Sequence, residues 1–531
     1  MDWNFGDLLD ATAATVPDDR PALIHQNRVT TWANFDQRTN RVARAMRAAG
    51  LEVGDRVAIL ARNIPEFVEI AVAAFKARLT HVNINYRYTT AEIDYVLADC
   101  GAAALFYQDE FSDTVAPLFR SASNLSLRVR IGSTVSAVGP VYEELATAGD
   151  GSPLGIVRSP DDGYLLYTGG TTGRPKGVMW RSGDARAVQL EAPTIKTLVR
   201  NMKEHVAVVR ANPMPGRVIP ACPLMHGAGL NSSMAELVGG GTVILLPSQR
   251  FDALELWTEA ERHAATRILI VGDAFARPMM RALEAHPHRW DLSTLRVISS
   301  AGLMWSEEVR TALVRLLPEV TLVDILGASE ASGFGYAITT RESQPATGIF
   351  EPGRNTVLIG LEDDRVLEQT EAGEGWLARR APFARGYYRD EAKTAATYRM
   401  IGGIRYAIPG DLAARDERGR IRLIGRNNLC INTGGEKVFV EEVEEALKRV
   451  PDIEDALVVG VADPDWGSAV AALLCVGPGY DELLVRAQLK EVLAAYKIPK
   501  YLLPTRELPR QPSGKGDYRR AHAIIKQRLS N

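Results

Sequence analysis

A segment rich in glycine and threonine, with one lysine, follows a short apolar run at residues 163–167. We assign to it Thr168, Gly169, Gly170, Thr171, Thr172, Gly173 and Lys176. Glycines allow backbone N–H groups to turn inward around an anion, threonine hydroxyls add donors, and the lysine adds a positive charge. The spacing differs from that of a P-loop, in which Gly-Lys is followed at once by Ser or Thr. We interpret the segment as a polyphosphate-binding loop, and a flexible hairpin turn is the alternative.

Two carboxylates are candidate ligand-binding residues. Glu330 follows a strand-like run at residues 320–325, which includes Asp324, and open α/β sheets bind ligands at such strand ends. One protein carboxylate suits Mg²⁺, which keeps waters and substrate phosphates as its other ligands. Asp411 follows Gly410, and a carboxylate can accept hydrogen bonds from both hydroxyls of a ribose. Taken singly, Glu330 and Asp411 could each be part of an exposed turn.

In this order, these segments resemble the signature motifs of the adenylate-forming enzymes, the superfamily of acyl-CoA synthetases, luciferases and nonribosomal adenylation domains. The glycine-rich loop is similar to their phosphate-binding motif, with Gly169 in place of the usual serine. Residues 326–330 resemble their Tyr-Gly-x-Thr-Glu motif, with Leu326 replacing the aromatic residue and Ser329 replacing threonine. The resemblance implies that Glu330 binds the magnesium of ATP and that Ser329 and Asp324 belong to the nucleotide site.

Three further motifs extend the resemblance. Ala301 and Gly302 lie in a small-residue turn that packs against adenine in the superfamily. Asp411 matches the aspartate that binds ribose, and Arg426 matches the arginine near it. Lys515 lies in Pro-x-x-Pro-Ser-Gly-Lys, a motif whose lysine reaches the substrate carboxylate and the α-phosphate. Because a cation there stabilises the charge that gathers during phosphoryl transfer, we expect Lys515 to be catalytic.

The same resemblance implies the acyl and CoA sites. His226 matches a histidine between the nucleotide and acyl sites; we expect it to be catalytic with Glu330, though not as a general base. To the walls of the acyl pocket we assign His226, Gly227, Gly272, Asp273 and Leu303, with core packing as the alternative for the apolar members. Gly434 and Gly435 match the loop that lines the CoA channel, and Asn428 matches the hinge. The glutamates at residues 441–444 are interpreted as a solvated helix face.

The patterning predicts an α/β fold. Residues 56–60 are expected to form a buried strand followed by a helix at 65–77, an alternation typical of a mostly parallel sheet covered by helices. We expect a large N-terminal domain of α/β-sheet subdomains at residues 1–427. Its last part, residues 353–427, has short segments and charged turns that indicate a β-rich subdomain. A small mobile α+β C-terminal domain is expected at residues 428–531.

Composition bears on partners and compartment. The chain carries 62 Lys and Arg against 65 Asp and Glu, so its net charge of −3 gives no reason to expect nucleic acid as a partner. The 4 cysteines form no Cys-x-x-Cys pair, which fits a reducing cytoplasm. Neither a signal peptide nor an apolar run long enough for a transmembrane segment is visible. A peripheral membrane contact and a homodimer stay open.

The expected reaction has two steps. A carboxylate attacks the α-phosphate of ATP to give an acyl-adenylate and pyrophosphate, and the thiol of CoA then displaces AMP. Two easier steps replace a hard one because the mixed anhydride has a good leaving group. We expect ATP, Mg²⁺ and coenzyme A as cofactors, and a medium- or long-chain, branched or sterol-derived carboxylate as substrate. The alternatives are an acyl-AMP ligase or luciferase-like adenylating enzyme, and a catalytically silent nucleotide-binding protein.

Overall fold

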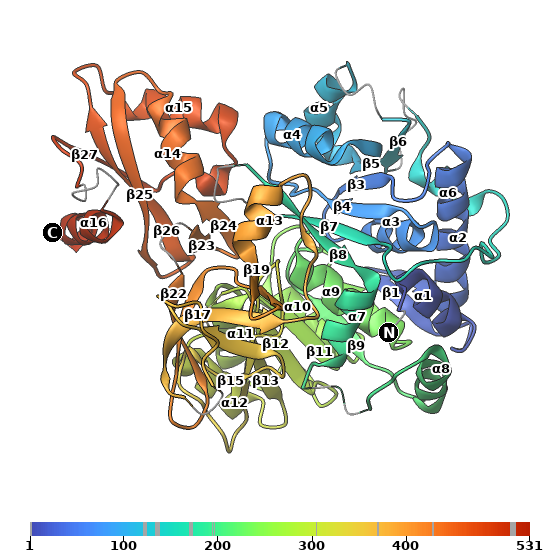
Figure 1. Ribbon diagram of the computed structural model, residues 1–531. Coiled ribbons are helices and arrows are strands. Elements are labelled where there is room, and N and C mark those ends of the chain that lie inside the picture. The colour runs from blue at the N-terminus through green and yellow to red at the C-terminus, as the bar shows by residue number, and fades with distance from the viewer. Residues whose placement is uncertain are drawn as a thin grey trace.

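The computed structural model describes residues 3–120, 125–132, 139–168, 174–193, 195, 197–303, 305–368, 371–426, 430–509 and 517–530. Within these residues the chain forms a large N-terminal domain built on two sheets and a small C-terminal domain beside it (Figure 1). This mixed α/β architecture, with one large and one small domain, is the one that the sequence predicts.

The larger sheet is parallel in one half and antiparallel in the other. In order of pairing, its strands are β19 (Tyr398–Ile401), β20 (Ile404–Ala407), β17 (Gly373–Arg380), β21 (Asp411–Arg415), β22 (Ile421–Arg426), β15 (Ile349–Pro352), β14 (Gly335–Thr339), β13 (Thr321–Leu326), β12 (Val297–Ala301), β11 (Arg267–Ile270), β9 (Arg217–Pro220), β10 (Thr242–Leu245), β1 (Pro21–His25) and β2 (Arg28–Thr31), with β16 (Thr356–Ile359) beside β17. Strands β13 to β1 pair in parallel, whereas the pairs from β13 to β19 are antiparallel. The predicted β-rich region therefore continues the α/β sheet through β15.

The second sheet presents two apolar faces. Its order is β18 (Gly386–Tyr387), β8 (Lys176–Arg181), β7 (Gly163–Thr168), β4 (Thr80–Asn83), β3 (Arg56–Leu60), β5 (Ala102–Gln108) and β6 (Leu127–Ile131). Alternation along β7 sends Tyr164 and Leu166 to the core between the sheets, and Leu165 and Tyr167 to the core on the other face. Such two-sided burial explains why these strands appear in the sequence as continuous apolar runs.

Helices fill the layers around these sheets. In the large domain they are α1 (Phe5–Ala13), α2 (Trp32–Ala48), α3 (Pro65–Lys76), α4 (Thr90–Cys100), η1 (Asp109–Phe111), α5 (Ser112–Val115), η2 (Ala116–Arg120), α6 (Tyr142–Thr147), α7 (Ser182–Leu190), α8 (Met202–Ala211), α9 (Gly227–Val238), α10 (Ala253–Arg262), α11 (Gly272–Ala285), α12 (Glu307–Leu316) and α13 (Glu391–Thr397). Helices α1, α2, α3 and α9 share the core between the sheets, α10 to α12 cover the outer face of the large sheet, and α4 covers the other sheet. Among the helices of the described ranges, none has the length and apolarity needed to cross a bilayer.

The small domain is a sheet with helices on both faces. It contains the hairpin β23 (Cys430–Thr433) and β24 (Glu436–Phe439), the sheet β25 (Ile453–Asp463), β26 (Gly467–Val476) and β27 (Tyr501–Thr505), and the helices α14 (Val440–Lys448), α15 (Glu482–Val492), η3 (Ala495–Lys497) and α16 (Tyr518–Ser530). Val470 and Leu474 of β26 pack against α14 and α15, whereas Ala471 and Leu473 pack against α16. Figure 1 shows α16 on the side of this domain away from the large one.

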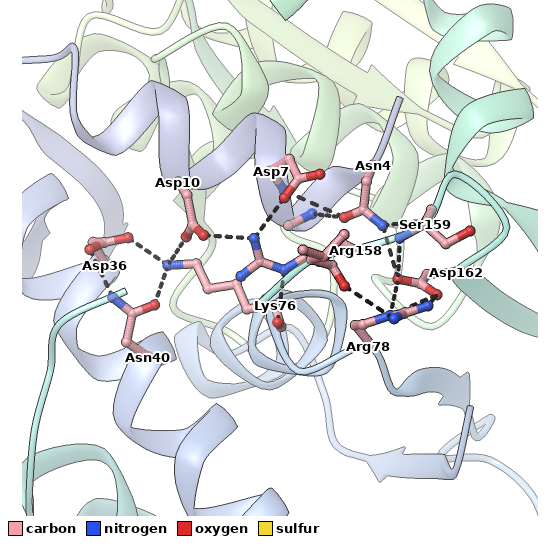
Figure 2. Close-up of polar contacts among 12 residues, drawn as sticks. Asn4, Asp7, Asp10, Asp36, Asn40, Lys76, Arg78, Arg158, Ser159 and Asp162 are labelled. Carbon is pink, nitrogen blue, oxygen red and sulfur yellow. Dashed lines mark hydrogen bonds and ion pairs between the residues drawn. The ribbon is translucent and has the colours of Figure 1, made fainter. Parts of the chain in front are cut away.

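A buried lysine ties three N-terminal helices together. Lys76 at the end of α3 is 1% exposed, and its ammonium group lies 3.2 Å from Asp10 of α1 and also pairs with Asp36 of α2 (Figure 2). Asn40 accepts a further hydrogen bond from it at 2.9 Å. Arg158 joins the same network, because it donates to the carbonyl of Lys76 and pairs with Asp10 at 2.8 Å. The network therefore holds α1, α2 and α3 in fixed positions relative to one another.

Lys76→Met should destabilise the large domain. The change removes the positive charge that pairs with Asp36, whereas Asp10 keeps its second partner, Arg158. Removing one member of a buried ion pair costs about 3–5 kcal/mol. We expect a clear drop in the thermal unfolding midpoint. Lys203→Met, at an exposed position on α8, is the matched control and should leave the midpoint nearly unchanged. Equal midpoints for the two variants would show that the network contributes little.

Candidate active site

The predicted phosphate loop starts where β7 and β8 face each other. Thr168 ends β7 and lies directly opposite Lys176, the first residue of β8. The ammonium group of Lys176 lies 2.7 Å from Asp390, which also caps α13 by accepting a hydrogen bond from the N–H of Lys393. Burial lowers the pKa of Lys176, but the hydrogen bond to Asp390, the charge of Asp390 and the neighbouring acidic groups together more than offset this, so the pKa lies above its usual value. Lys176 is thus positively charged and stands at the end of the loop, where β8 begins.

Part of the predicted site lies outside the described residues. These positions are Gly169, Gly170, Thr171, Thr172, Gly173, Asn428 and Lys515. Of Arg426 the structure describes the backbone, which stands directly opposite Asp411 in the pairing of β21 with β22. The two residues predicted to lie near the ribose are therefore neighbours in the sheet.

The carboxylate of Glu330 is fixed just after β13. Glu330 is 8% exposed, and the hydroxyl of Tyr387 donates a hydrogen bond of 2.7 Å to its Oε1. Burial, followed by the charge of Glu330, raises the pKa of Tyr387 well above its usual value, so the phenol stays a donor. The loop itself is held by Tyr398, which donates to the carbonyl of Glu330, and by Trp180, which donates to the carbonyl of Ser329. Strands of both sheets thus set the position of one carboxylate.

The predicted adenine residues lie at the carboxyl ends of neighbouring parallel strands. Ala301 ends β12 and pairs with Ile325 of β13, while Ser300 pairs with Asp324. Gly302 follows with a φ of 94°, in the left-handed region. Burial raises the pKa of Asp324 to about 7, against the opposing charge of Arg310. Ala301, Gly302 and Asp324 therefore share one sheet edge with the loop that carries Glu330.

His226 and Gly227 begin α9 beside a small apolar cluster, which we call the acyl cluster. Its members are Cys222, Leu269 and Val271, which are buried, and Ala228, Phe275 and Leu303, which pack against them. Leu303 was assigned to the acyl pocket from the sequence, and the structure places it in this cluster. The N–H of Gly272 donates to Ser300 at 2.8 Å.

Asp273 has structural partners in this arrangement. Its carboxylate accepts a hydrogen bond of 2.9 Å from the N–H of Ser306 and lies 3.0 Å from Arg277. These contacts join the start of α11 to the residue that precedes α12. Asp273 thus supports the wall that carries the acyl cluster.

A glycine pair of the small domain lies against the acyl cluster. Gly434 and Gly435 connect β23 to β24 with φ values of 55° and 88°, and the N–H of Gly434 donates to the carbonyl of Trp466 at 3.0 Å. A Cβ atom on Gly435 would lie only 3.2 Å from Val271 Cγ1. Glycine therefore satisfies both the backbone conformation and the close approach. The predicted CoA loop and the predicted acyl pocket are in contact.

Glu436, directly after this glycine pair, is buried against the large domain. Its side chain is 4% exposed and lies 3.3 Å from His226 Nε2 and 3.2 Å from Arg87. Asn85 donates a further hydrogen bond of 3.1 Å to Glu436 Oε2. Burial favours the neutral acid, but these neighbours more than offset it and hold the pKa of Glu436 below its usual value. A charged carboxylate of the small domain thus meets donors of the large domain.

Two glutamates expected on a solvated helix face are buried, so that prediction is wrong for them. Glu442 is 8% exposed and Glu444 is 6% exposed. The ammonium group of Lys497 lies 2.7 Å from Glu442 and 2.6 Å from Glu92 of α4 in the large domain. Glu444 accepts a hydrogen bond from the N–H of Val458. Helical spacing alone does not show which face another domain or strand covers.

Sequence reasoning missed the residues that join the domains. Glu436 and Lys497 of the small domain, and Asn85 of the large one, were not singled out. One signal was available for Glu436, because it directly follows the glycine pair assigned to the CoA channel. No local pattern marks Asn85, which lies 351 positions away from its partner Glu436.

Family models and curated relatives match nearly the whole chain. A model described as AMP-binding enzyme matches residues 9–388, and one described as AMP-binding enzyme C-terminal domain matches residues 442–515. The 3-oxocholest-4-en-26-oate–CoA ligase of Rhodococcus rhodochrous is 37% identical over 98% of this chain and 95% of that protein. The medium-chain acyl-CoA ligase Mig of Mycobacterium avium is 36% identical over 96% of each chain.

Solved structures share the fold. The amide bond synthetase McbA from Marinactinospora thermotolerans is 25% identical and has a TM-score of 0.82, covering 98% of this chain and 100% of that one. A fatty acyl CoA synthetase of Mycobacterium tuberculosis, 21% identical with a TM-score of 0.68, covers 99% of this chain and 98% of that one. With a family model over most of its length and relatives aligned from end to end, the protein belongs to the AMP-binding enzyme family of ATP-using, adenylate-forming ligases.

Proposed function

We propose that the protein is an acyl-CoA synthetase, which converts a carboxylic acid and ATP to an acyl-adenylate and then passes the acyl group to CoA. The single observation that carries this proposal is the contact of Gly435 with Val271, next to His226. It brings the loop predicted to line the CoA channel to the place where the acyl group would lie. The relatives named as CoA ligases support the same activity.

The nucleotide would lie along the carboxyl edge of the large sheet. Adenine would pack against Ala301 and Gly302, the ribose hydroxyls would bind Asp411, and Lys176 would meet the outer phosphates. Lys176 must then exchange Asp390 for phosphate, which is an exchange of one anionic partner for another. We propose that His226 contacts the substrate carboxylate beside the acyl cluster.

The donor set at Glu330 fits Mg²⁺ carried by ATP. No group of three or more His, Cys, Asp or Glu side chains that could hold a metal occurs in the described part of the chain. Mg²⁺ needs no such cage, because it usually binds one or two carboxylates together with waters and phosphates. Glu330 would hold the ion, with Tyr387 fixing the orientation of the carboxylate through the bond to Oε1. When bound, the ion would neutralise charge on the phosphates.

The two half-reactions would use different faces of the small domain. Gly434 and Gly435 already face the acyl cluster, whereas the segment with Lys515 is flanked by Pro509 and Asp517, which are joined by a hydrogen bond of 2.9 Å. Leu508, just before Pro509, packs on the α16 side of the domain. We propose that the small domain, with its boundary at residues 427 and 428 and Asn428 as hinge, turns to bring Lys515 to the α-phosphate for the first step.

The acyl group is proposed to be a medium- or long-chain, branched or sterol-derived one. The named substrates of the relatives are of these kinds, and the acyl cluster is lined by apolar side chains. We further propose that the enzyme works in the cytoplasm, since Cys100, Cys222 and Cys475 are free. A homodimer and a peripheral membrane contact stay predictions.

A ligase that passes the acyl group to an amine is the second candidate. It is favoured by the similarity to an amide bond synthetase over the whole chain. AMP formation from ATP and a panel of carboxylates, measured with CoA, with amines and with neither, separates the candidates. A dependence on CoA supports the synthetase, a dependence on amines supports the amide ligase, and silence supports a nucleotide-binding protein without activity.

Lys515→Ala and Glu436→Gln should impair opposite half-reactions. We expect Lys515→Ala to abolish pyrophosphate release from ATP and carboxylate while thioester formation from supplied acyl-adenylate and CoA stays largely intact. Glu436→Gln removes the charge that docks the glycine loop, so we expect thioester formation from the acyl-adenylate to fall about tenfold or more, with a smaller effect on pyrophosphate release. Equal losses in both steps for either variant would contradict the assigned roles.

Lys497→Met should weaken the same docked arrangement by another contact. The change leaves Glu92 and Glu442 close together without their shared cation, which disfavours the contact of the domains. We expect slower thioester formation from supplied acyl-adenylate. Lys526→Met, exposed on α16, is the control and should match the wild type. Unchanged thioester formation in Lys497→Met would show that this buried ion group is dispensable for the second step.

A further inference from the structure

Arg186 in α7 is a buried cation without a carboxylate partner among the described residues. It is 7% exposed, and burial lowers the pKa of its guanidinium to about 10, so it stays charged at neutral pH. Its Nη1 donates to Gln189 Oε1 at 3.2 Å, and its Nε has no hydrogen-bond partner in that part of the structure. A buried charge is unfavourable unless other groups pair with it. The guanidinium therefore has hydrogen-bonding capacity to spare.

The neighbours of Arg186 that the structure describes are polar but supply no carboxylate to it. Ser182, one helical turn earlier on the same face of α7, is 1% exposed, and its hydroxyl is also without a partner among the residues described. On α8, His205 has its pKa lowered to about 4 by burial and then by Arg186, so its ring is neutral. That ring is already engaged with Thr12 at 3.0 Å. A ligand atom, rather than a protein carboxylate, would complete this cluster.

A chain of contacts links this cluster to the start of α9 at His226. A Cβ atom on Gly227 would lie 3.0 Å from Leu166 Cδ1 and 3.7 Å from Asn231 Nδ2, so glycine allows β7 to approach the start of α9 closely. Asn231 lies one turn, about 6 Å, further along α9. Its Oδ1 accepts a hydrogen bond of 3.0 Å from Tyr164, the neighbour of Leu166 on the inner face of β7.

From Asn231 the contacts continue to α7. Gln189 Nε2 donates to the carbonyl of Asn231 at 3.3 Å, and Gln189 in turn accepts the hydrogen bond from Arg186. Strand β7 and helix α9 thus lie side by side. One end of this pair is at Thr168 and His226, and the other end is next to Gln189 and Arg186 of α7. An acyl chain that started at His226 and followed them would end at Gln189 and Arg186.

We propose that Arg186, with Gln189, determines substrate specificity by binding an oxygen atom at the far end of the carboxylic acid. The proposal rests on the acyl-CoA synthetase function proposed above and narrows its substrates to acids of medium length with a distal hydrogen-bond acceptor. A guanidinium has donors only, so the ligand atom must be an acceptor. A ketone and a second carboxylate share this chemistry. A saturated chain would leave the guanidinium unpaired.

The test compares three acids of equal chain length. They are octanoate, its keto analogue with the carbonyl next to the terminal methyl group, and octanedioate. The kcat/KM for CoA-dependent AMP formation is measured for each with the wild type, with Arg186→Met and with the control Arg210→Met, which is exposed on α8. Because a hydrogen bond to a charged group is a strong one, we expect the wild type to prefer the better oxygen-bearing acid over octanoate by about tenfold or more.

Arg186→Met should reduce that preference to near unity, while Arg210→Met should retain it. Preference for the keto acid identifies a carbonyl as the bound group, and preference for octanedioate identifies a carboxylate. The proposal is overturned if the wild type shows no preference for an oxygen-bearing acid over octanoate. It is also overturned if Arg186→Met keeps the full preference while thermal unfolding shows that this variant is folded. If no acid of the carboxylate panel gives CoA-dependent AMP, the proposed function fails. If other acids of the panel are activated but these three are not, or if octanoate is activated as well as the other two, this inference alone is overturned.

Discussion

The carboxylate of Glu436 is a charge that the small domain can bury only with the help of the large one. Its ion-pair and side-chain hydrogen-bond partners in the described chain, Asn85, Arg87 and His226, all belong to the large domain. A buried carboxylate without such partners would pay a desolvation cost of several kcal/mol. The contact therefore selects one arrangement of the domains, and the glycine pair is delivered to the acyl cluster as a consequence.

The same arrangement explains the composition of the loop. Gly434 and Gly435 adopt positive φ values, and a Cβ atom on Gly435 would lie only 3.2 Å from Val271 Cγ1, a tight contact. Lys497 adds a second charged contact, shared between Glu442 and Glu92, on another part of the boundary. Two separate ionic contacts thus hold this boundary, and the proposed turn of the small domain would have to break both.

The sequence predicted those parts of the molecule that depend on local pattern. The run at residues 56–60 became β3 within its predicted bounds, and Glu330 stands after β13 as expected. The features that the sequence could not reveal depend on contacts between distant segments. The partnership of Glu436 with Asn85 is one such contact, and the burial of Glu442 and Glu444 is another. The continuity of the β-rich region with the α/β sheet also escaped prediction, because strand pairing through β15 leaves no mark in either segment.

The burial of Arg186 is a further feature that the sequence could not reveal. Its helix is short, and nothing in the spacing of α7 distinguishes an arginine that faces solvent from one that is buried. Only the neighbours on α8 and α9 show that it is enclosed. The motifs at the sheet edge could therefore be found in the sequence, whereas the burial of Arg186 could be found only in the structure.

Measuring the distance between the two domains tests most directly the claim that the small domain takes up a different arrangement in each half-reaction. Spin labels on Arg281 of α11 and Lys526 of α16, both exposed, would report it after replacement of the half-buried Cys475. The account predicts one distance with AMP and CoA, in the arrangement described here, and a second distance with ATP and octanoate before CoA is added. A single unchanged distance under both conditions, in a protein that still forms thioester, would contradict it.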